Sequence, residues 1–261
     1  DNTIRYRNPF ASRSTFPKYP QTSVIIDYFI PEETKDNLQL EILDANGGSV
    51  VTIVSDSTQL KSSTKVVEDM NLSRTFIYVN NKLSRKAGLN RFEWNLRQKG
   101  AWHKEKKHSY KYGPMVAPGS YTVKLTLGDK ILERSFEILM DPRVKGEGIS
   151  KTDIQTQLLM QNKVINLLSE ARKLQADLEE EAEALEGKKA KAKVARLEKI
   201  NLVLKQLKND EGAYPQQMLV SQISYLWGMI SGADQLPGQG AEKRYKSLVS
   251  KLKEVKDESL P

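Results

Sequence analysis

The spacing of the apolar residues changes near Asp141 and Pro142, and this change limits the possible folds more than any other feature. Before it, apolar and polar residues alternate in short runs, as in β-strands with one buried face. After Ser150, apolar residues recur every three or four positions, as in amphipathic helices. We therefore expect a multidomain β-then-α chain, with a sheet domain over 1–144, including an N-terminal linker segment over 1–22, and a helical domain over 145–261.

Turn residues divide the first part into separate strands. Gly47 and Gly48 tolerate the backbone angles of a tight hairpin, and Pro118 with Gly119 opens a second hairpin. The polar stretch 55–73 is interpreted as a long loop or a poorly formed edge strand. The alternating runs cover 24–30, 38–43, 49–54, 90–97, 121–127 and 130–139. Such strands are typical of an immunoglobulin or fibronectin III-like β-sandwich.

The second part carries four apolar stripes at helical spacing. Ser150 and Asp153 form a capping pair, which predicts the start of a long helix that continues to Gly187. Three shorter stripes follow over 190–207, 215–230 and 241–255. Because short connections join neighbouring helices in opposite directions, we expect an antiparallel four-helix bundle.

The stretch 212–233 holds no charged residue and is long enough for a membrane-spanning helix. It also carries the polar or helix-breaking residues Pro215, Gln216, Gln217, Ser221, Gln222, Ser224 and Ser231. This content favours a buried helix of the bundle, and we predict no membrane span.

Composition excludes several classes of chemistry. The 41 Lys and Arg against 33 Asp and Glu give a net charge of +8, which is spread along the chain and indicates solubility rather than nucleic-acid binding. The absence of cysteine excludes disulfides, thiolate catalysis and Cys-ligated zinc. His103 and His108 are five positions apart, which fits no metal-binding pair. We expect no metal, no cofactor and no nucleic-acid partner.

One segment between two strands combines aromatic, basic and imidazole side chains. The candidate ligand-binding residues are Trp102, His103, Tyr110 and Tyr112. Sugars stack their C–H faces on Trp and Tyr rings, so the segment is a candidate carbohydrate-binding surface. The alternative is an exposed connection in which Trp102 folds back on its own sandwich.

Catalysis is not predicted. Glycoside hydrolysis requires two carboxyl groups opposed across a cleft. Asp27, Glu41 and Glu93 are the strand carboxylates available, and each lies on the polar side of an alternating strand. Solvent exposure explains all three, and no phosphate loop, nucleophile elbow or histidine triad is present. We predict no catalytic residue.

Several motifs share a family resemblance. They are 8–9, 24–31, 40–47, 87–97, the Ala117-Pro118-Gly119-Ser120-Tyr121-Thr122-Val123 run, and Met140-Asp141-Pro142-Arg143-Val144. Together they resemble the region that follows the β-propeller in large secreted bacterial proteins with sortilin-like or BNR-type repeats, which are often labelled glycosyl hydrolases. The second hairpin is also similar to the immunoglobulin-like module of flagellar hook-capping proteins.

The resemblance implies a role and a location. It implies a non-catalytic accessory region that packs on or positions the N-terminal β-propeller of the same parent chain, in a secreted, periplasmic or cell-surface protein. No Asp-box motif occurs in this sequence, so any glycoside hydrolase activity is expected in the parent. Because the chain starts at Asp1 and not Met, we expect a piece of a longer protein. The alternative function is a carbohydrate-binding module that uses the Trp102–Tyr112 loop.

Overall fold

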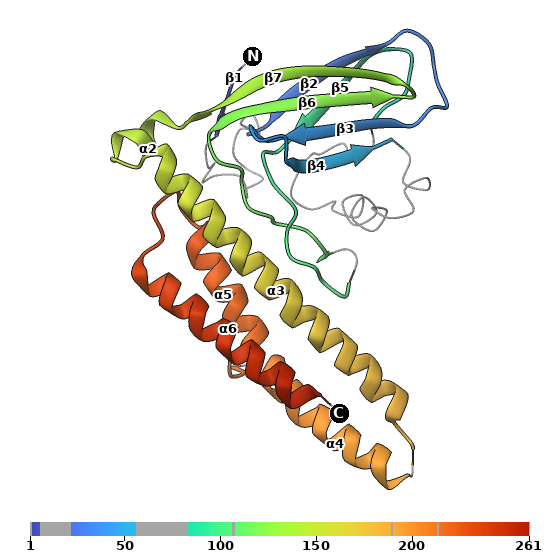
Figure 1. The fold of residues 1–261 in the computed structure, drawn as a ribbon, viewed down its shortest axis with the longest axis vertical. Coiled ribbons are helices and arrows are strands. Elements are labelled where there is room, and N and C mark those ends of the chain that lie inside the picture. The colour runs from blue at the N-terminus through green and yellow to red at the C-terminus, as the bar shows by residue number, and fades with distance from the viewer. Residues whose placement is uncertain are drawn as a thin grey trace.

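A computed structural model describes residues 2–5, 22–55, 83–105, 108–188, 190–212 and 214–260. Two β-sheets lie at one end of a long helical bundle, and the short helix α2 (Pro142–Gly146) leads from one part to the other (Figure 1). The polar stretch predicted as a loop or edge strand over 55–73 lies outside the described residues, apart from Ser55.

The larger sheet has five strands in the order β1-β7-β6-β3-β4. Their bounds are β1 (Asn2–Arg5), β3 (Leu38–Leu43), β4 (Ser49–Val54), β6 (Gly119–Leu127) and β7 (Lys130–Met140). The second sheet pairs β2 (Val24–Ile30) with β5 (Gly88–Trp94) in antiparallel register. The alternating strands bury one face each, so Leu40, Phe92 and Trp94 meet in one apolar cluster between the sheets.

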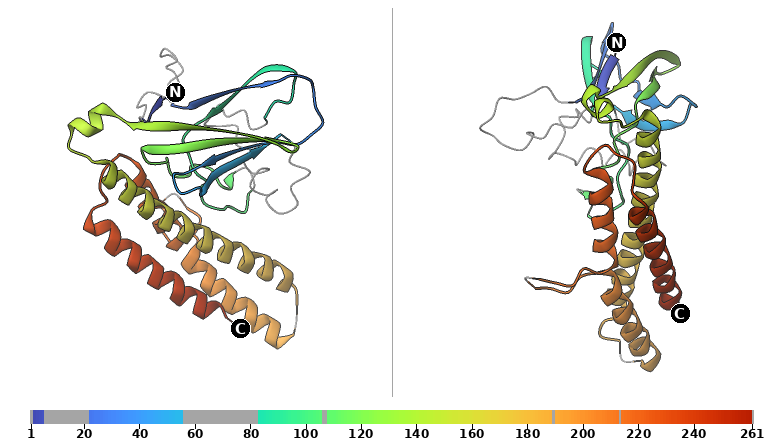
Figure 2. Two further views of the ribbon diagram at one scale, coloured as in Figure 1. Left: turned by 45° about the horizontal axis from the view of Figure 1, so that its top comes forward. Right: turned by 90° about the vertical axis from the view of Figure 1, so that its left-hand side faces the viewer.

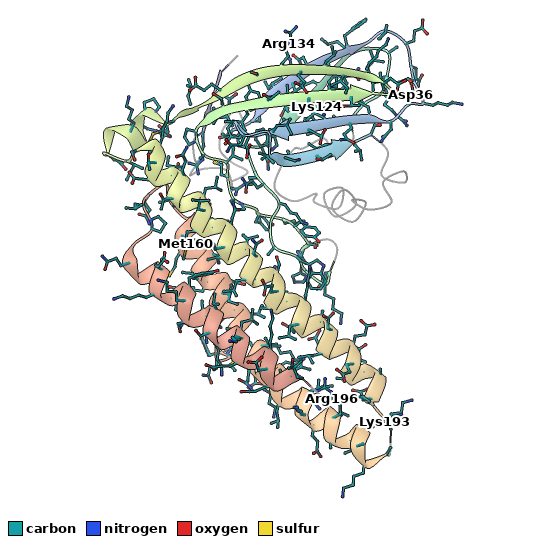
Figure 3. All side chains as sticks on the ribbon, viewed as in Figure 1. Asp36, Lys124, Arg134, Met160, Lys193 and Arg196 are labelled. Atoms are coloured by element: carbon teal, nitrogen blue, oxygen red, sulfur yellow. The ribbon has the colours of Figure 1, made fainter. Side chains whose placement is uncertain are left out.

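Four longer helices form the bundle: α3 (Lys151–Leu185), α4 (Lys191–Leu207), α5 (Leu219–Ser231) and α6 (Gln239–Ser259). The predicted cap of α3 is confirmed, because Ser150 Oγ accepts the Asp153 N–H at 3.1 Å and the Asp153 carboxylate accepts the Ser150 N–H at 2.8 Å. Buried side chains such as Met160 fill the space between the helices (Figure 3). The bundle therefore has an apolar cluster separate from that of the sheets.

The prediction of an immunoglobulin or fibronectin III-like β-sandwich is wrong. β1 lies parallel to β7 at the edge of a five-stranded sheet, and the second sheet has only β2 and β5 within the described ranges. The sequence did not reveal β1 because its four residues are too few to show an alternation, and they fall in the segment 1–22 that was predicted as a linker.

The prediction of an antiparallel four-helix bundle is also wrong. Arg196 near the start of α4 pairs with Glu181 near the end of α3, and the Ile230 carbonyl at the end of α5 accepts a hydrogen bond from Gln161 near the start of α3. Both α4 and α5 therefore run antiparallel to α3, one after the other (Figure 2). The reason is that the chain does not reverse between α4 and α5. In the connector, the Asn209 side chain accepts the Met218 N–H at 2.8 Å.

The uncharged stretch predicted as a buried helix forms α5, which has 13 residues and buries Leu219, Ile223, Leu226 and Ile230. Among the described residues, no helix is both long and apolar enough to cross a membrane.

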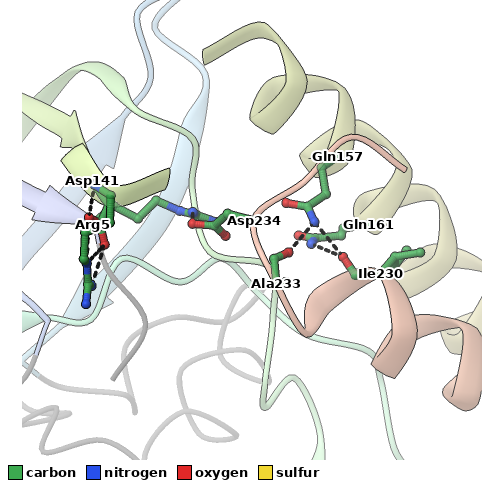
Figure 4. A network of polar contacts seen from close by, with 8 residues as sticks. Arg5, Asp141, Gln157, Gln161, Ile230, Ala233 and Asp234 are labelled. Atoms are coloured by element: carbon green, nitrogen blue, oxygen red, sulfur yellow. Dashed lines mark hydrogen bonds and ion pairs between the residues drawn. The ribbon is translucent and has the colours of Figure 1, made fainter. Parts of the chain in front are cut away.

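A buried ion pair joins the sheets to the bundle. Arg5 of β1 pairs with Asp234, which follows α5, and their side chains are only 2% and 4% exposed (Figure 4). Beside this pair, the side-chain amides of Gln157 and Gln161 donate to the Ile230 carbonyl at 3.0 and 2.8 Å. These bonds satisfy carbonyl groups that the end of a helix leaves without partners. β1 is thus fixed to the bundle as well as to β7.

We predict that Arg5→Met destabilises the protein by about 3–5 kcal/mol, because it removes the arginine partner of the buried Asp234 carboxylate. The double variant Arg5→Met/Asp234→Leu should recover most of this loss, since it removes both charges. Urea unfolding measures each change. The control is Arg91→Met, which breaks the exposed pair with Asp27 and should cost far less stability, because solvent screens an exposed pair. Equal stability of the Arg5 and Arg91 single variants contradicts the prediction.

Candidate functional site

The β5–β6 loop (95–118) extends from the sheets along α3 (Figure 1). Its two arms pair through their backbones. Val116 N–H donates to the Leu96 carbonyl at 2.8 Å, and Gly100 N–H donates to the Tyr110 carbonyl at 2.9 Å. Residues 106–107 lie outside the described part of the loop. The pairing makes the loop an irregular hairpin with a defined shape.

Two glycines allow the arms to approach closely. A Cβ atom on Gly100 would lie 1.8 Å from the Lys111 carbonyl oxygen, and one on Gly113 would lie 1.9 Å from that of Gln98. Both distances are far below van der Waals contact with backbone atoms that cannot rotate away. Glycine is therefore required at these two positions.

The same loop holds strained backbone. Leu96, Tyr110 and Tyr112 have φ angles of 63°, 59° and 56°, and they are the non-glycine residues with positive φ among those described. Such conformations cost free energy and persist where the surroundings enforce them, often at ligand-binding sites. The Lys99 ammonium lies 3.8 Å from the centre of the Tyr110 ring, which adds a cation–π contact.

The loop docks on α3 through its first arm. Trp102 N–H donates to Ser169 Oγ at 3.0 Å, and Arg172 Nη1 donates to the Trp102 carbonyl at 3.3 Å. Ala101 is 3% exposed and belongs to the apolar cluster of the bundle. Further along, Lys104 pairs with Glu179 at 3.4 Å. Both backbone polar groups of Trp102 are thus satisfied by side chains of α3.

A cleft of about 350 Å³ lies between the docked loop and the bundle. The loop, α3 and α5 all contribute to its lining, which comprises Ala101, His103, His108, Lys111, Tyr112, Ile165, Leu168, Arg172, Ser224 and Trp227. Apolar and aromatic walls with a few convergent polar groups are typical of small-molecule sites, and this volume is at the lower end of their range.

A wider hollow of about 510 Å³ lies beside the sheets and is lined by Glu33, Thr34, Lys35, Arg85 and Lys86. No aromatic or other large apolar side chain is among these lining residues, so the hollow is the weaker candidate for a ligand site.

Apart from Tyr112, the titratable side chains among the described residues that line the cleft are all basic. Burial lowers the pKa of His103, and the positive charges of Arg172 and His108 lower it further. Burial likewise lowers the pKa of Arg172. His103 Nδ1 accepts the Glu105 N–H at 3.0 Å, which assigns the proton of the neutral ring to Nε2. The cleft therefore presents hydrogen-bond donors and positive potential.

The four predicted ligand-binding residues divide into two pairs. His103 and Tyr112 line the cleft, and Tyr112 is 46% exposed. Trp102 and Tyr110 are partly buried in the loop and do not line it. The Trp102 backbone docks on α3, and the alternative in which its side chain folds back on the sheets stays a prediction.

The sequence patterns do not point to the bundle side of the cleft. Arg172 and Trp227 stand on amphipathic helices, where an arginine or a tryptophan at the edge of an apolar stripe is ordinary. They lie far from the loop in sequence, so no local spacing links them to it. The one available signal was Trp227 in a helix without charges.

The strand carboxylates do not converge. Asp27 forms a two-bond pair with Arg91, at 2.7 and 2.9 Å, and the hydrogen bond from Arg91 lowers its pKa. Glu41 lies on the other sheet, 3.9 Å from Lys124. Glu93 stands on β5 opposite Ile25. Over the described ranges, no group of three or more His, Cys, Asp or Glu could hold a metal ion.

No protein-family model matches the chain, and no curated protein matches it. The resemblance to the region after a sortilin-like or BNR-type propeller therefore stays a prediction, and the function is argued from the cleft.

Proposed function

We propose that this chain is a non-enzymatic binding region whose ligand is a carbohydrate, held in the cleft between the β5–β6 loop and the bundle. The observation that carries the proposal is the meeting of Tyr112 and Trp227 with Arg172 around one hollow. Aromatic rings accept the apolar faces of a sugar ring, and arginine donates hydrogen bonds to its oxygens. This arrangement favours the function predicted for the Trp102–Tyr112 loop, with a different set of residues.

The rigidity of the loop supports the proposal. The close approach at Gly100 and Gly113 and the bond from Trp102 to Ser169 hold one wall of the cleft in place without a ligand. A site that is already formed loses less conformational entropy on binding, which increases affinity for a small ligand. Tyr112, whose φ angle is positive, belongs to the same wall of the cleft.

We predict that the chain binds oligosaccharides on a glycan array and that Tyr112→Asn weakens this binding about tenfold or more, as loss of a central aromatic contact does. Asparagine tolerates positive φ, so the variant removes the ring and keeps the loop. Isothermal titration calorimetry gives the affinities. The control is Tyr225→Ala, since Tyr225 is 72% exposed on α5 and does not line the cleft. A blank array, or unchanged affinity for Tyr112→Asn, contradicts the proposal.

A second candidate function is the accessory role beside a β-propeller in a secreted, periplasmic or cell-surface parent protein. The observation that favours it is the outer face of the β2–β5 sheet. Ile25, Phe29 and Leu89 are 54%, 68% and 74% exposed there. Phe29 and Leu89 are cross-strand partners, so they form one apolar patch. The outer face of a two-layer sheet structure is usually polar, and an apolar patch on it favours a protein contact.

This second role predicts protection of the patch in a longer chain. Hydroxyl-radical labelling of Phe29 and Leu89 should fall severalfold when a β-propeller precedes these residues in the same natural polypeptide, compared with this chain alone. Tyr214, which is 99% exposed in the connector between α4 and α5, is the control and should be labelled equally in both. Equal labelling of Phe29 and Leu89 in the two chains contradicts the docking role.

A further inference from the structure

We propose that the cleft selects acidic carbohydrate, in which a sugar carboxylate binds Arg172 while the sugar ring contacts Tyr112 and Trp227. This inference rests on the proposed carbohydrate-binding function and names the substrate class of the same site. Its first basis is charge: Lys111 and Arg172 line the cleft together with the imidazoles of His103 and His108, and no acidic side chain is among the described residues that line it. A neutral sugar requires no such excess of positive charge.

Arg172 is the second basis. It is partly buried, and among the described residues it has no carboxylate partner. Its hydrogen bond to the Trp102 carbonyl uses one of the five N–H groups of the guanidinium. Buried charges are normally paired, and in this protein the buried Arg5 and the partly buried Arg196 each pair with a carboxylate. A ligand carboxylate would supply the missing partner.

The nearby acids are already engaged. Glu105 lies 3.7 Å from His108, on the loop. Glu179 of α3 contacts Lys104 at 3.4 Å and Lys208 at 3.6 Å. α5 contributes only Ser224 and Trp227 to the cleft, so it brings no charge to the site. Within the described cleft, no acidic side chain is therefore placed to neutralise the Arg172 guanidinium.

The aromatic wall distinguishes an acidic sugar from a free anion. Phosphate or acetate would satisfy Arg172 but has no apolar face to lie against the Tyr112 and Trp227 rings. A planar carboxylate matches the two parallel N–H groups of a guanidinium, and the attached ring brings apolar C–H groups to the aromatic side chains. A uronic acid residue has both features.

The experiment is calorimetric titration of the intact chain with trigalacturonate and with its methyl ester, which keeps the rings and removes the charge. We expect the acid to bind about tenfold or more tightly than the ester, because hydrogen bonds to charged groups are the stronger ones. Arg172→Gln should abolish this preference, although glutamine can still donate to the Trp102 carbonyl. Arg244→Gln changes the net charge equally on the exposed face of α6 and should keep the preference.

Acidity should strengthen the binding. Burial and the neighbouring positive charges lower the pKa of His103 from its usual 6.5, so its ring becomes charged only at lower pH, and protonation of Nδ1 must displace the Glu105 N–H. A bound carboxylate favours the charged ring, so the acid should bind more tightly as the pH falls below about 6.5. The facing groups that set this response are His108, Lys111 and Glu105 on the loop and Arg172 on α3. His103→Gln should reduce the pH dependence of acid binding, while the ester should show none from this source.

The outcomes separate the two proposals. Equal affinity for acid and ester overturns the acidic selectivity and leaves carbohydrate binding standing. Binding of neither, together with a blank glycan array, overturns both. If sodium phosphate or acetate binds as tightly as trigalacturonate, the proposal of a sugar ligand is overturned and the cleft is a simple anion site.

Discussion

The docking of Trp102 on α3 is the contact on which the site depends. Its N–H and carbonyl groups bind the side chains of Ser169 and Arg172, and the adjacent Ala101 enters the apolar cluster of the bundle. Backbone groups removed from water must find partners, so the loop can lie along the helix only because α3 supplies them. The cleft exists because this contact brings the loop against α3 and α5.

The rest of the fold keeps the loop and the bundle, which form the two walls of the cleft, in fixed relative positions. α3 is 35 residues long and carries both the bundle core and the docking residues. At its start, the buried pair between Arg5 and Asp234 links the sheets to the end of α5. A displacement of the sheets relative to the bundle would therefore break a buried ion pair and leave charges without compensation. The apolar cluster of the sheets and that of the bundle are in this way held in fixed relative positions.

Local periodicity predicted the elements other than β1 and α2 and failed on their arrangement. The alternating runs from Val24 to Leu139 form strands, and the cap at Ser150 starts α3. The direction of α5 follows from the connector before it, where Asn209 accepts the Met218 N–H, and no spacing of apolar residues reveals it. The same limit applies to the site: two loop residues could be found by their side-chain chemistry, whereas Arg172 comes to them only through tertiary packing.

The most direct test is native-state hydrogen exchange of the Trp102 amide, read by NMR together with the amide of Val164 in the α3 core. If the loop is docked as described, the Trp102 amide exchanges only through the opening that also exposes the core of α3, so both are strongly protected. Exchange of the Trp102 amide at the rate of an unprotected loop, while the Val164 amide stays protected, would contradict the account.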